Sequence, residues 1–289
     1  MTEYVLSSNI SRWRAGIPSL LQYRNLVLGA SIVAVLLLTG LLAPLWAPYD
    51  PYAQNLSVTF HPPGWSHLFG TDEYGRDMFS RVLYGARLSQ LEIALSVGMA
   101  LAIGVPLGMV SGYMGGVVDQ VILWFIDLLY AFPGIVLAIL IVAILGPGLF
   151  DSLVAISLFA IPVYTRLARN LTLSLKRMEY IEAARALGAG PWRIIFHHIL
   201  RNAAIPILVQ ATLTAGDVVL TASGLSFLGL GAQPPLAEWG AMMAEGRNFL
   251  GVATYLTFFP GAAITLTALG LNLLGDGLRD RLDPRFRPR

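Results

Sequence analysis

The chain has 289 residues, of which 56% are hydrophobic and 12% charged, with a mean hydropathy of +0.66. A soluble domain carries about a quarter charged residues, so this composition indicates a polytopic membrane protein. A basic excess in such a protein usually has a topological origin, so we expect no nucleic-acid partner. The absence of cysteine excludes disulfides and thiolate metal sites.

Six apolar stretches are long enough to cross a bilayer as helices, which needs about 17 to 25 residues. The first is too long for the apolar core of a signal peptide, so we interpret it as a retained anchor. The predicted fold is therefore all-α with six transmembrane helices, at residues 25–46, 88–111, 120–145, 149–167, 203–228 and 253–275.

The positive charges divide unequally between the two sides of this arrangement. With the N-terminus inside, 15 of the 19 Lys and Arg residues are cytoplasmic, in segment 1–24, the central loop and the tail 276–289. This split follows the positive-inside rule and predicts that both termini are cytoplasmic. Segment 47–87, rich in Pro, Gly and aromatic residues, is then external.

Small residues and prolines mark the second and third predicted spans. Gly104, Gly108 and Gly112 are four residues apart on one helix face, which favours close packing of helix backbones. Pro106 and Pro133 predict kinks that neighbouring helices accommodate.

Two carboxylates lie inside predicted spans, where ionisable side chains are costly. Asp127 and Asp217 are therefore candidates for lining a translocation pathway. The alternative, a carboxylate tied to a hydroxyl or Arg of a neighbouring helix, stays open for both. Glu92 is near the outer end of its span, and we expect it to be solvated.

The central loop contains a charged, broken helix at residues 179–201. Strong helix formers run to Leu187, then Gly188 and Gly190 supply a break and Pro191 suits the start of a second helix. The second helix is amphipathic. Its apolar side carries Trp192, Ile195, Phe196 and Ile199, and its polar side carries Arg193, His197 and Arg201. Such a helix can lie on lipid, on its own bundle or in a partner's groove; the compact hairpin favours docking.

The hairpin and four further blocks carry a family resemblance. EAARALG at residues 182–188, followed by Ile199 and Leu200, resembles the EAA motif in membrane subunits of bacterial ABC importers. The segments at residues 61–89, 127–140, 224–240 and 272–285 resemble the dipeptide/oligopeptide/nickel permease family, specifically its C-type subunit. The resemblance covers roughly residues 25–285.

The resemblance implies a type I ABC importer permease fold. Five helices within residues 88–275 form the core, and the first helix braces it. The hairpin is then the coupling helix, seated in a cleft of a cytoplasmic ATPase. Glu182, Ala183, Ala184 and Gly188 match the motif, and the coupling surface continues over Trp192, Arg193 and Phe196.

Two positions depart from the family pattern. Arg201 stands where Pro is common, so the exit from the coupling helix is expected to be less sharply bent. Ala222 stands where many relatives carry Glu, so the role of that Glu cannot be assigned to this position. Asp217, five residues earlier, is a candidate to take its place.

The resemblance also implies partners and a location. These are a homologous B-type permease, two ABC ATPases and an external solute-binding protein, in a bacterial cytoplasmic membrane. Lys176 is the sole lysine and follows no glycine, so a phosphate-binding loop is absent and we expect no enzyme activity. No cofactor is expected on this chain, with ATP and Mg²⁺ on the ATPases. Dipeptides or oligopeptides are the expected substrate; nickel, glutathione, haem and oligosaccharides are the alternatives.

Other function classes fit less well. An intramembrane aspartyl protease would pair Asp127 with Asp276, but Leu273 replaces the first glycine of the GxGD pattern. A passive channel would need rings of carbonyls or charges and would not need an ATPase dock. His197 and His198 are adjacent on a helix and poorly placed to chelate. His61 and His67, in the external segment, could contact a binding protein or a metal, but a structural role is favoured, so no metal site is predicted.

Overall fold

The structure, a computed structural model, describes residues 24–282. Predictions for residues 1–23 and 283–289, including five of the arginines assigned to the cytoplasm, lie outside this part. The described residues form helices joined by loops, without a strand, and the all-α prediction is confirmed. The main helices are α3 (Arg24–Trp46), α4 (Met78–Met114), α5 (Gly116–Tyr130), α6 (Gly134–Leu145), α7 (Leu149–Leu175), α8 (Glu179–Ala186), α9 (Pro191–Arg193), α10 (Leu200–Phe227), α11 (Trp239–Gly246) and α12 (Tyr255–Leu282).

Five helices are long and apolar enough to span a membrane, or six if the bent pair α5 and α6 forms one span. The third predicted span, residues 120–145, is disturbed at Pro133 as predicted, but the disturbance is a break between two helices and not a kink within one. It breaks between Tyr130 and Gly134 with a bend of 89°. Pro133 explains the break, because it lacks an N–H and keeps Phe132 out of the helical region.

α4 begins at Met78 rather than at residue 88, so the last part of segment 47–87 is helical; we call residues 47–77, which are predicted to be external, the external segment. The Asp77 carboxylate caps the helix by accepting hydrogen bonds from the Ser80 amide at 2.8 Å and the Ser80 hydroxyl at 2.7 Å. The helix can start this early because Arg81, which interrupts the apolar pattern, is buried in an ionic cluster. α7 likewise continues through Arg166 and Arg169 to Leu175, so these residues belong to a helix and not to the central loop.

The most extensive helix contact among the described residues joins α4 and α7. A Cβ built on Gly104, Gly108 or Gly112 would lie 2.8, 2.2 or 2.7 Å from the carbonyl oxygens of Ile161, Thr165 and Arg169, respectively. No other residue type leaves room for this approach. The three glycines therefore lie where the backbones of α4 and α7 touch, as their four-residue spacing predicts.

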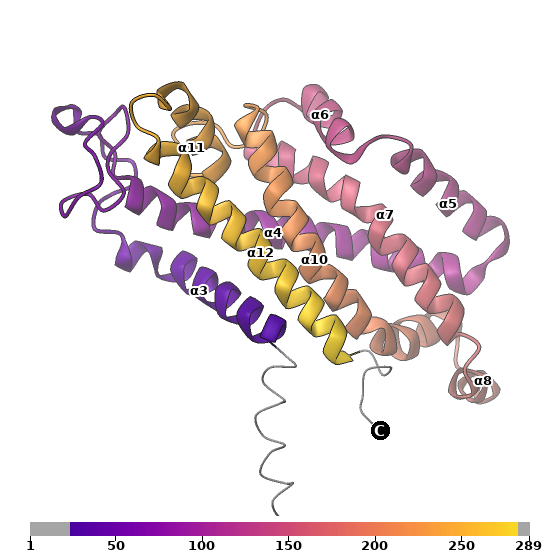
Figure 1. Ribbon diagram of the computed structural model, residues 1–289. Helices are drawn as coiled ribbons and strands as arrows, with labels where there is room; N and C mark the ends of the chain where they lie inside the picture. Colours follow the sequence, from indigo (N-terminus) through magenta and orange to yellow (C-terminus); the bar gives the residue numbers. More distant parts are fainter. Residues whose placement is uncertain (1–23, 283–289) are drawn as a thin grey trace, which may run out of the picture.

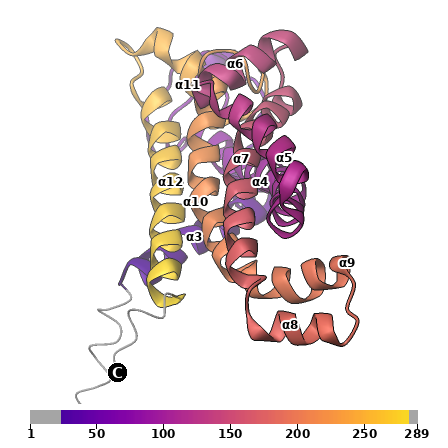
Figure 2. The same cartoon turned by 90° about the vertical axis from the view of Figure 1, so that its right-hand side faces the viewer.

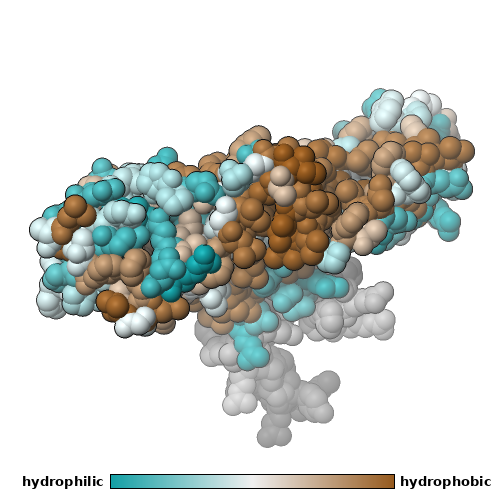
Figure 3. Space-filling model, turned by 90° about the horizontal axis from the view of Figure 1, so that it is seen from above, coloured by the Kyte–Doolittle hydropathy of each residue, from teal (hydrophilic) through white to brown (hydrophobic). Residues whose placement is uncertain are grey.

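The helices form an elongated bundle with distinct ends (Figure 1). α3 packs on α12 and α4 at its edge, and α10 contacts α12, α7 and α4. The external segment and α11 gather at one end, while α8, the start of α3 and the end of α12 lie toward the other. Apolar side chains form a broad field over the middle of the molecule, and polar ones gather where the external segment lies (Figure 3).

Candidate functional site

The most exposed functional candidate is a hairpin that projects from the bundle, built from α8 and from α9 with the π-helix Ile194–Ile199 (Figure 2). Gly188 makes the turn at φ +85°, a conformation that side chains with a Cβ rarely adopt. Its amide donates to the Arg185 carbonyl at 2.9 Å, and Pro191 starts the second helix. The predicted break is therefore where the chain turns.

The inner side of the hairpin is a small apolar core of its own. Ile181, Ile194 and Ile199 are completely buried and pack with Tyr113 at the end of α4 and Leu175 at the end of α7. The Arg185 guanidinium lies 5.3 Å from the centre of the Tyr113 ring. These contacts fix the hairpin to two bundle helices.

The predicted apolar stripe on the second helix is wrong in part. Ile195 and Ile199 are buried together with Ile194, whereas Trp192 and Phe196 are 57% and 46% exposed, so the four predicted residues do not share one face. The cause is the π-helix, whose wider turn breaks the four-residue spacing on which the stripe depended. The helix also continues through Arg201 directly into α10, in agreement with the weaker bend expected there.

The outer side exposes a mixed apolar and charged surface, which we call the outer hairpin face. The Trp192 and Phe196 rings stack with centroids 6.0 Å apart, and Leu187 at the tip is 89% exposed. Ala184 is half-buried. The outer hairpin face comprises the exposed residues Glu182, Ala183, Leu187, Gly188, Trp192, Arg193 and Phe196. Exposed aromatic and aliphatic side chains held on a rigid scaffold are typical of a protein contact.

The two pathway candidates lie on the bundle surface. Asp127 is paired with Arg166 on α7 at 2.6 Å, with the two side chains 64% and 46% exposed. The same guanidinium lies 4.1 Å from the centre of the Tyr130 ring. Asp217 on α10 is exposed. Asp127 is therefore tied to an arginine of a neighbouring helix, which was one of the two alternatives considered for it. The charged groups of Asp127, Arg166 and Asp217 are all accessible.

A second ion pair, missed by the sequence analysis, holds the turn between α4 and α5. The Arg169 guanidinium donates two hydrogen bonds of 2.6 Å to the Asp119 carboxylate, which also accepts from the Ser111 hydroxyl. Lys176 donates to the Gly112 carbonyl at 2.6 Å. The one sequence feature that could have indicated this cluster is the position of Asp119, an acidic residue directly before the apolar stretch 120–145.

A third cluster, also missed, lies under the external segment. Arg76 and Arg81 are 2% and 1% exposed, although the sequence placed them among the external charges. Arg76 contacts Asp72 at 2.5 Å and Glu245 at 3.1 Å, and Arg81 lies 3.5 Å from Glu245. Burial raises the pKa of the neighbouring Glu73 carboxyl, and the nearby negative charges of Asp72 and Glu245 add to the rise.

The prediction that Glu92 is solvated is wrong. Glu92 is 2% exposed because α10 and α11 close over this part of α4. Glu238, at 0% exposed, lies near it and caps α11 by accepting from the amides of Gly240 and Ala241, both at 2.8 Å. Burial raises the pKa of Glu238, and these two hydrogen bonds oppose that rise. Ala222 is buried on α10.

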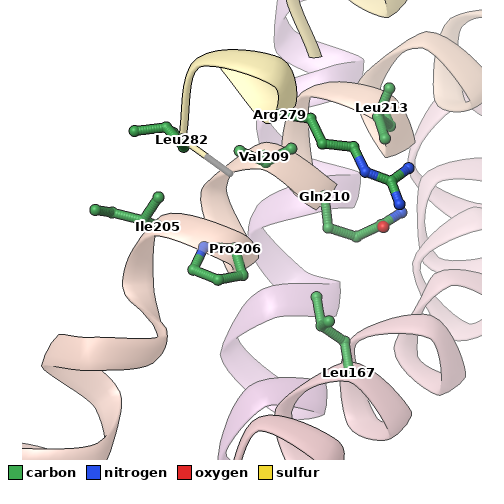
Figure 4. Close-up of a pocket in the computed structure, with 8 residues that line it drawn as sticks. All are labelled: Leu167, Ile205, Pro206, Val209, Gln210, Leu213, Arg279 and Leu282. Carbon is green, nitrogen blue, oxygen red and sulfur yellow. The ribbon is translucent and has the colours of Figure 1, made fainter. Parts of the chain in front are cut away.

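A cavity of about 380 Å³ lies between α7, α10 and α12 (Figure 4). Its polar side chains are Arg279 and Gln210, which lie together, and the rest of its lining is apolar.

His67, considered above as a metal ligand, instead contacts Asp77, with its Nδ1 2.9 Å from the carboxylate.

Comparisons with known proteins agree with the predicted family. Residues 104–288 match the family described as "Binding-protein-dependent transport system inner membrane component". The chain belongs to this family. Residues 11–63 of this permease-family chain match the "N-terminal TM domain of oligopeptide transport permease C", as the predicted C-type assignment requires.

Similar curated proteins include the dipeptide transport system permease protein DppC of Alkalihalophilus pseudofirmus, 44% identical over 96% of this chain and 91% of the relative. The probable D,D-dipeptide transport system permease protein DdpC of Escherichia coli is 46% identical over 90% and 87%. The glutathione transport system permease protein GsiD of Pectobacterium atrosepticum is 43% identical over 95% and 92%.

A solved structure shares the fold of this permease-family chain. It is titled "Inward facing conformations of the MetNI methionine ABC transporter", with a TM-score of 0.57 and 20% identity, covering 69% of this chain and 94% of that one. The type of fold predicted from the resemblance is therefore confirmed.

Proposed function

We propose that this chain is a pore-forming permease subunit of an ATP-driven, binding-protein-dependent importer that moves dipeptides or oligopeptides into the cytoplasm. The outer hairpin face carries the proposal, because it presents exposed Trp192, Phe196 and Leu187 on a projection that is anchored to the bundle. A surface of this kind suits a cleft in a cytoplasmic ATPase. ATP and Mg²⁺ belong to two such ATPases, and this chain itself binds no cofactor.

The anchoring supports a mechanical role for the hairpin. Force on Trp192 or Phe196 reaches the ends of α4 and α7 through the buried isoleucines and the contact between Arg185 and Tyr113. Because packed cores resist compression, the two helices move with the hairpin. Closure of the ATPases would thereby switch this chain and its B-type partner between inward-facing and outward-facing states.

The orientation follows from the charges at the hairpin end. Arg24 at the start of α3 and Arg279 near the end of α12 lie toward the same end of the bundle as α8. The positive-inside rule assigns this end to the cytoplasm. The external segment and α11 then face the side from which a solute-binding protein delivers its load.

Peptide cargo is supported by the relatives and by chemistry. Two of the relatives described above are named for dipeptides, and the third, named for glutathione, supports that peptide as the second candidate. Asp127, Arg166 and Asp217 supply both signs of charge on exposed positions of predicted spans. A zwitterionic peptide requires both signs along its path, because its ammonium and carboxylate groups must each find a partner when water is removed.

Cross-linking tests the dock directly, since the chain has no cysteine and a single introduced thiol is unique. Leu187→Cys at the tip should cross-link to the co-expressed ATPase, whereas Leu45→Cys, 80% exposed on α3, should not. In intact cells a membrane-impermeant thiol reagent should label Trp65→Cys in the external segment and leave Leu187→Cys unlabelled. External labelling of Leu187→Cys would overturn the orientation and the dock together.

A glycine pair supplies the matched functional control. Gly188→Ala forces a Cβ into the φ +85° turn and should weaken ATPase assembly, whereas Gly190→Ala, at φ −71° with open space around it, should not. Equal assembly and ATPase stimulation in both variants would mean that the hairpin is only a surface element.

A further inference from the structure

Two acidic side chains are buried where α10 and α11 pack on α4. Glu92 projects from α4 and Glu238 precedes α11, with exposures of 2% and 0%. They are close enough for their charges to interact. Two adjacent carboxylates in a low-dielectric interior cannot both stay ionised without a compensating positive charge.

Glu238 has the environment of an ionised carboxylate. Its two oxygens each accept a 2.8 Å hydrogen bond from the amides of Gly240 and Ala241, and the Ser223 hydroxyl lies 3.4 Å away. The N-terminal end of α11 also favours a negative charge at this position. These donors stabilise the anion.

Glu92 has the opposite environment. Its Oε2 atom is buried without a hydrogen-bond partner, and so are the hydroxyls of Ser89 and Ser96. These serines are three residues before and four residues after Glu92, which places all three side chains on one face of α4. An anionic Glu92 would be a buried acceptor whose desolvation nothing offsets.

No cation compensates the pair in the described part of the chain. On α4 itself the other charged or titratable groups are Arg81, which lies in the cluster with Asp72 and Glu245, Tyr84, the exposed Arg87 and Tyr113. The elements packed on α4 carry such groups at Arg24 (α3), Asp119, Asp127 and Tyr130 (α5), Asp151, Tyr164, Arg166 and Arg169 (α7), His197 and His198 (η2, Ile194–Ile199), Arg201 and Asp217 (α10), Glu245 (α11), and Tyr255, Asp276, Arg279, Asp280 and Arg281 (α12). The charge that acts on Glu92 comes from Glu238, which has the same sign.

We propose that Glu92 and Glu238 form a proton-binding site that holds one proton, carried by Glu92. The proton removes one of the two negative charges. No cavity is needed, because a proton adds no volume.

The site links α4, which carries Glu92, to the start of α11, which Glu238 caps. Loss of the proton leaves two buried negative charges that repel, so alkaline conditions should loosen this junction. The inference does not depend on the proposed transport function, because it follows from burial and hydrogen bonding within one chain.

Infrared spectroscopy of the full-length chain in lipid bilayers tests the proposal. The difference spectrum between the wild type and Glu92→Gln should contain the C=O stretch of a protonated carboxylic acid, which the variant lacks. Asp280→Asn, which neutralises an exposed carboxylate on α12, should leave that band in place. Glu92→Gln should also keep the thermal midpoint, because the amide mimics the neutral acid.

Other results would overturn the proposal. Absence of the acid band from the wild-type spectrum would mean that both carboxyls are ionised, and a midpoint that rises with Na⁺ or K⁺ concentration would identify a metal cation in place of the proton. A band lost in Glu238→Gln but kept in Glu92→Gln would place the proton on the wrong residue. If Glu92→Gln does not accumulate, alkaline titration of the wild-type band decides, since the band must disappear reversibly.

Discussion

Replacing Gly108 with alanine should force α4 and α7 apart. A Cβ on Gly108 would lie 2.2 Å from the Thr165 carbonyl oxygen, 2.9 Å from the Ala168 Cβ and 2.9 Å from the Arg169 amide nitrogen. None of these atoms belongs to the flexible end of a side chain. The new methyl group can therefore be accommodated only by moving one helix backbone.

The size of the effect follows from this geometry. Reaching ordinary contact with the carbonyl requires a shift of about 1 Å, which also loosens the neighbouring contacts at Gly104 and Gly112. Overpacking of this kind costs about 1–3 kcal/mol. The higher helix propensity of alanine returns at most about 1 kcal/mol, so the net change is destabilising.

Gly98→Ala is the matched control. Gly98 lies on the same helix, but a Cβ there has no atom within 4 Å. We expect the thermal midpoint of the purified chain in detergent to fall for Gly108→Ala and to stay level or rise for Gly98→Ala. Equal midpoints for the two variants would refute the close approach of α4 and α7.

Three further predictions concern the ionic clusters. Arg169→Lys should lower the free energy of unfolding by about 1–3 kcal/mol, because lysine cannot make the two parallel hydrogen bonds to Asp119; an unchanged denaturation midpoint would contradict this. Arg76→Met should destabilise the chain by about 3–5 kcal/mol by removing the closest cation from buried Asp72, which keeps only Arg81 at 3.8 Å, and limited proteolysis of the external segment should detect the loss. The raised pKa of Glu73 means that the folded state retains a proton that the unfolded state loses above about pH 4.5, so stability falls as pH rises through that window. Glu73→Gln should flatten the dependence of the thermal midpoint on pH there, and an equally steep profile would refute the assignment.

The sequence predicts the helical content well because the apolar stretches are long. Window hydrophobicity locates α3, α7, α10 and α12 to within a few residues at most ends, and the Gly188–Pro191 break locates the hairpin turn. Pro133 announces a disturbance in the third span. The angle of the bend, 89°, depends on how α5 and α6 pack on α7, which the local sequence does not encode.

The failures share one physical origin. Arg76, Arg81 and Glu92 are charged, and each was assigned to water because charge opposes burial. The structure buries Arg76 and Arg81 because Glu245, from a distant part of the chain, completes their ionic cluster with Asp72, and it buries Glu92 because α10 and α11 pack on α4. Pairing across such separations cannot be inferred from one sequence.

The hairpin surface failed for a local reason. Trp192 and Phe196 were predicted to share one apolar stripe with Ile195 and Ile199 by assuming a regular α-helix, and the π-helical turn at Ile194–Ile199 separates the two pairs. Of the residues nominated for coupling, Ala184 is half-buried and the other six are exposed.

Uptake into proteoliposomes tests the central claim most directly. The chain would be reconstituted with its B-type partner, the two ATPases and the solute-binding protein, and accumulation of a labelled dipeptide would be measured with ATP on the ATPase side. We predict uptake that requires ATP and the binding protein, that survives Gly190→Ala and that falls sharply in Gly188→Ala. Equal dipeptide entry with and without ATP would contradict the assignment of this chain to an ATP-driven importer.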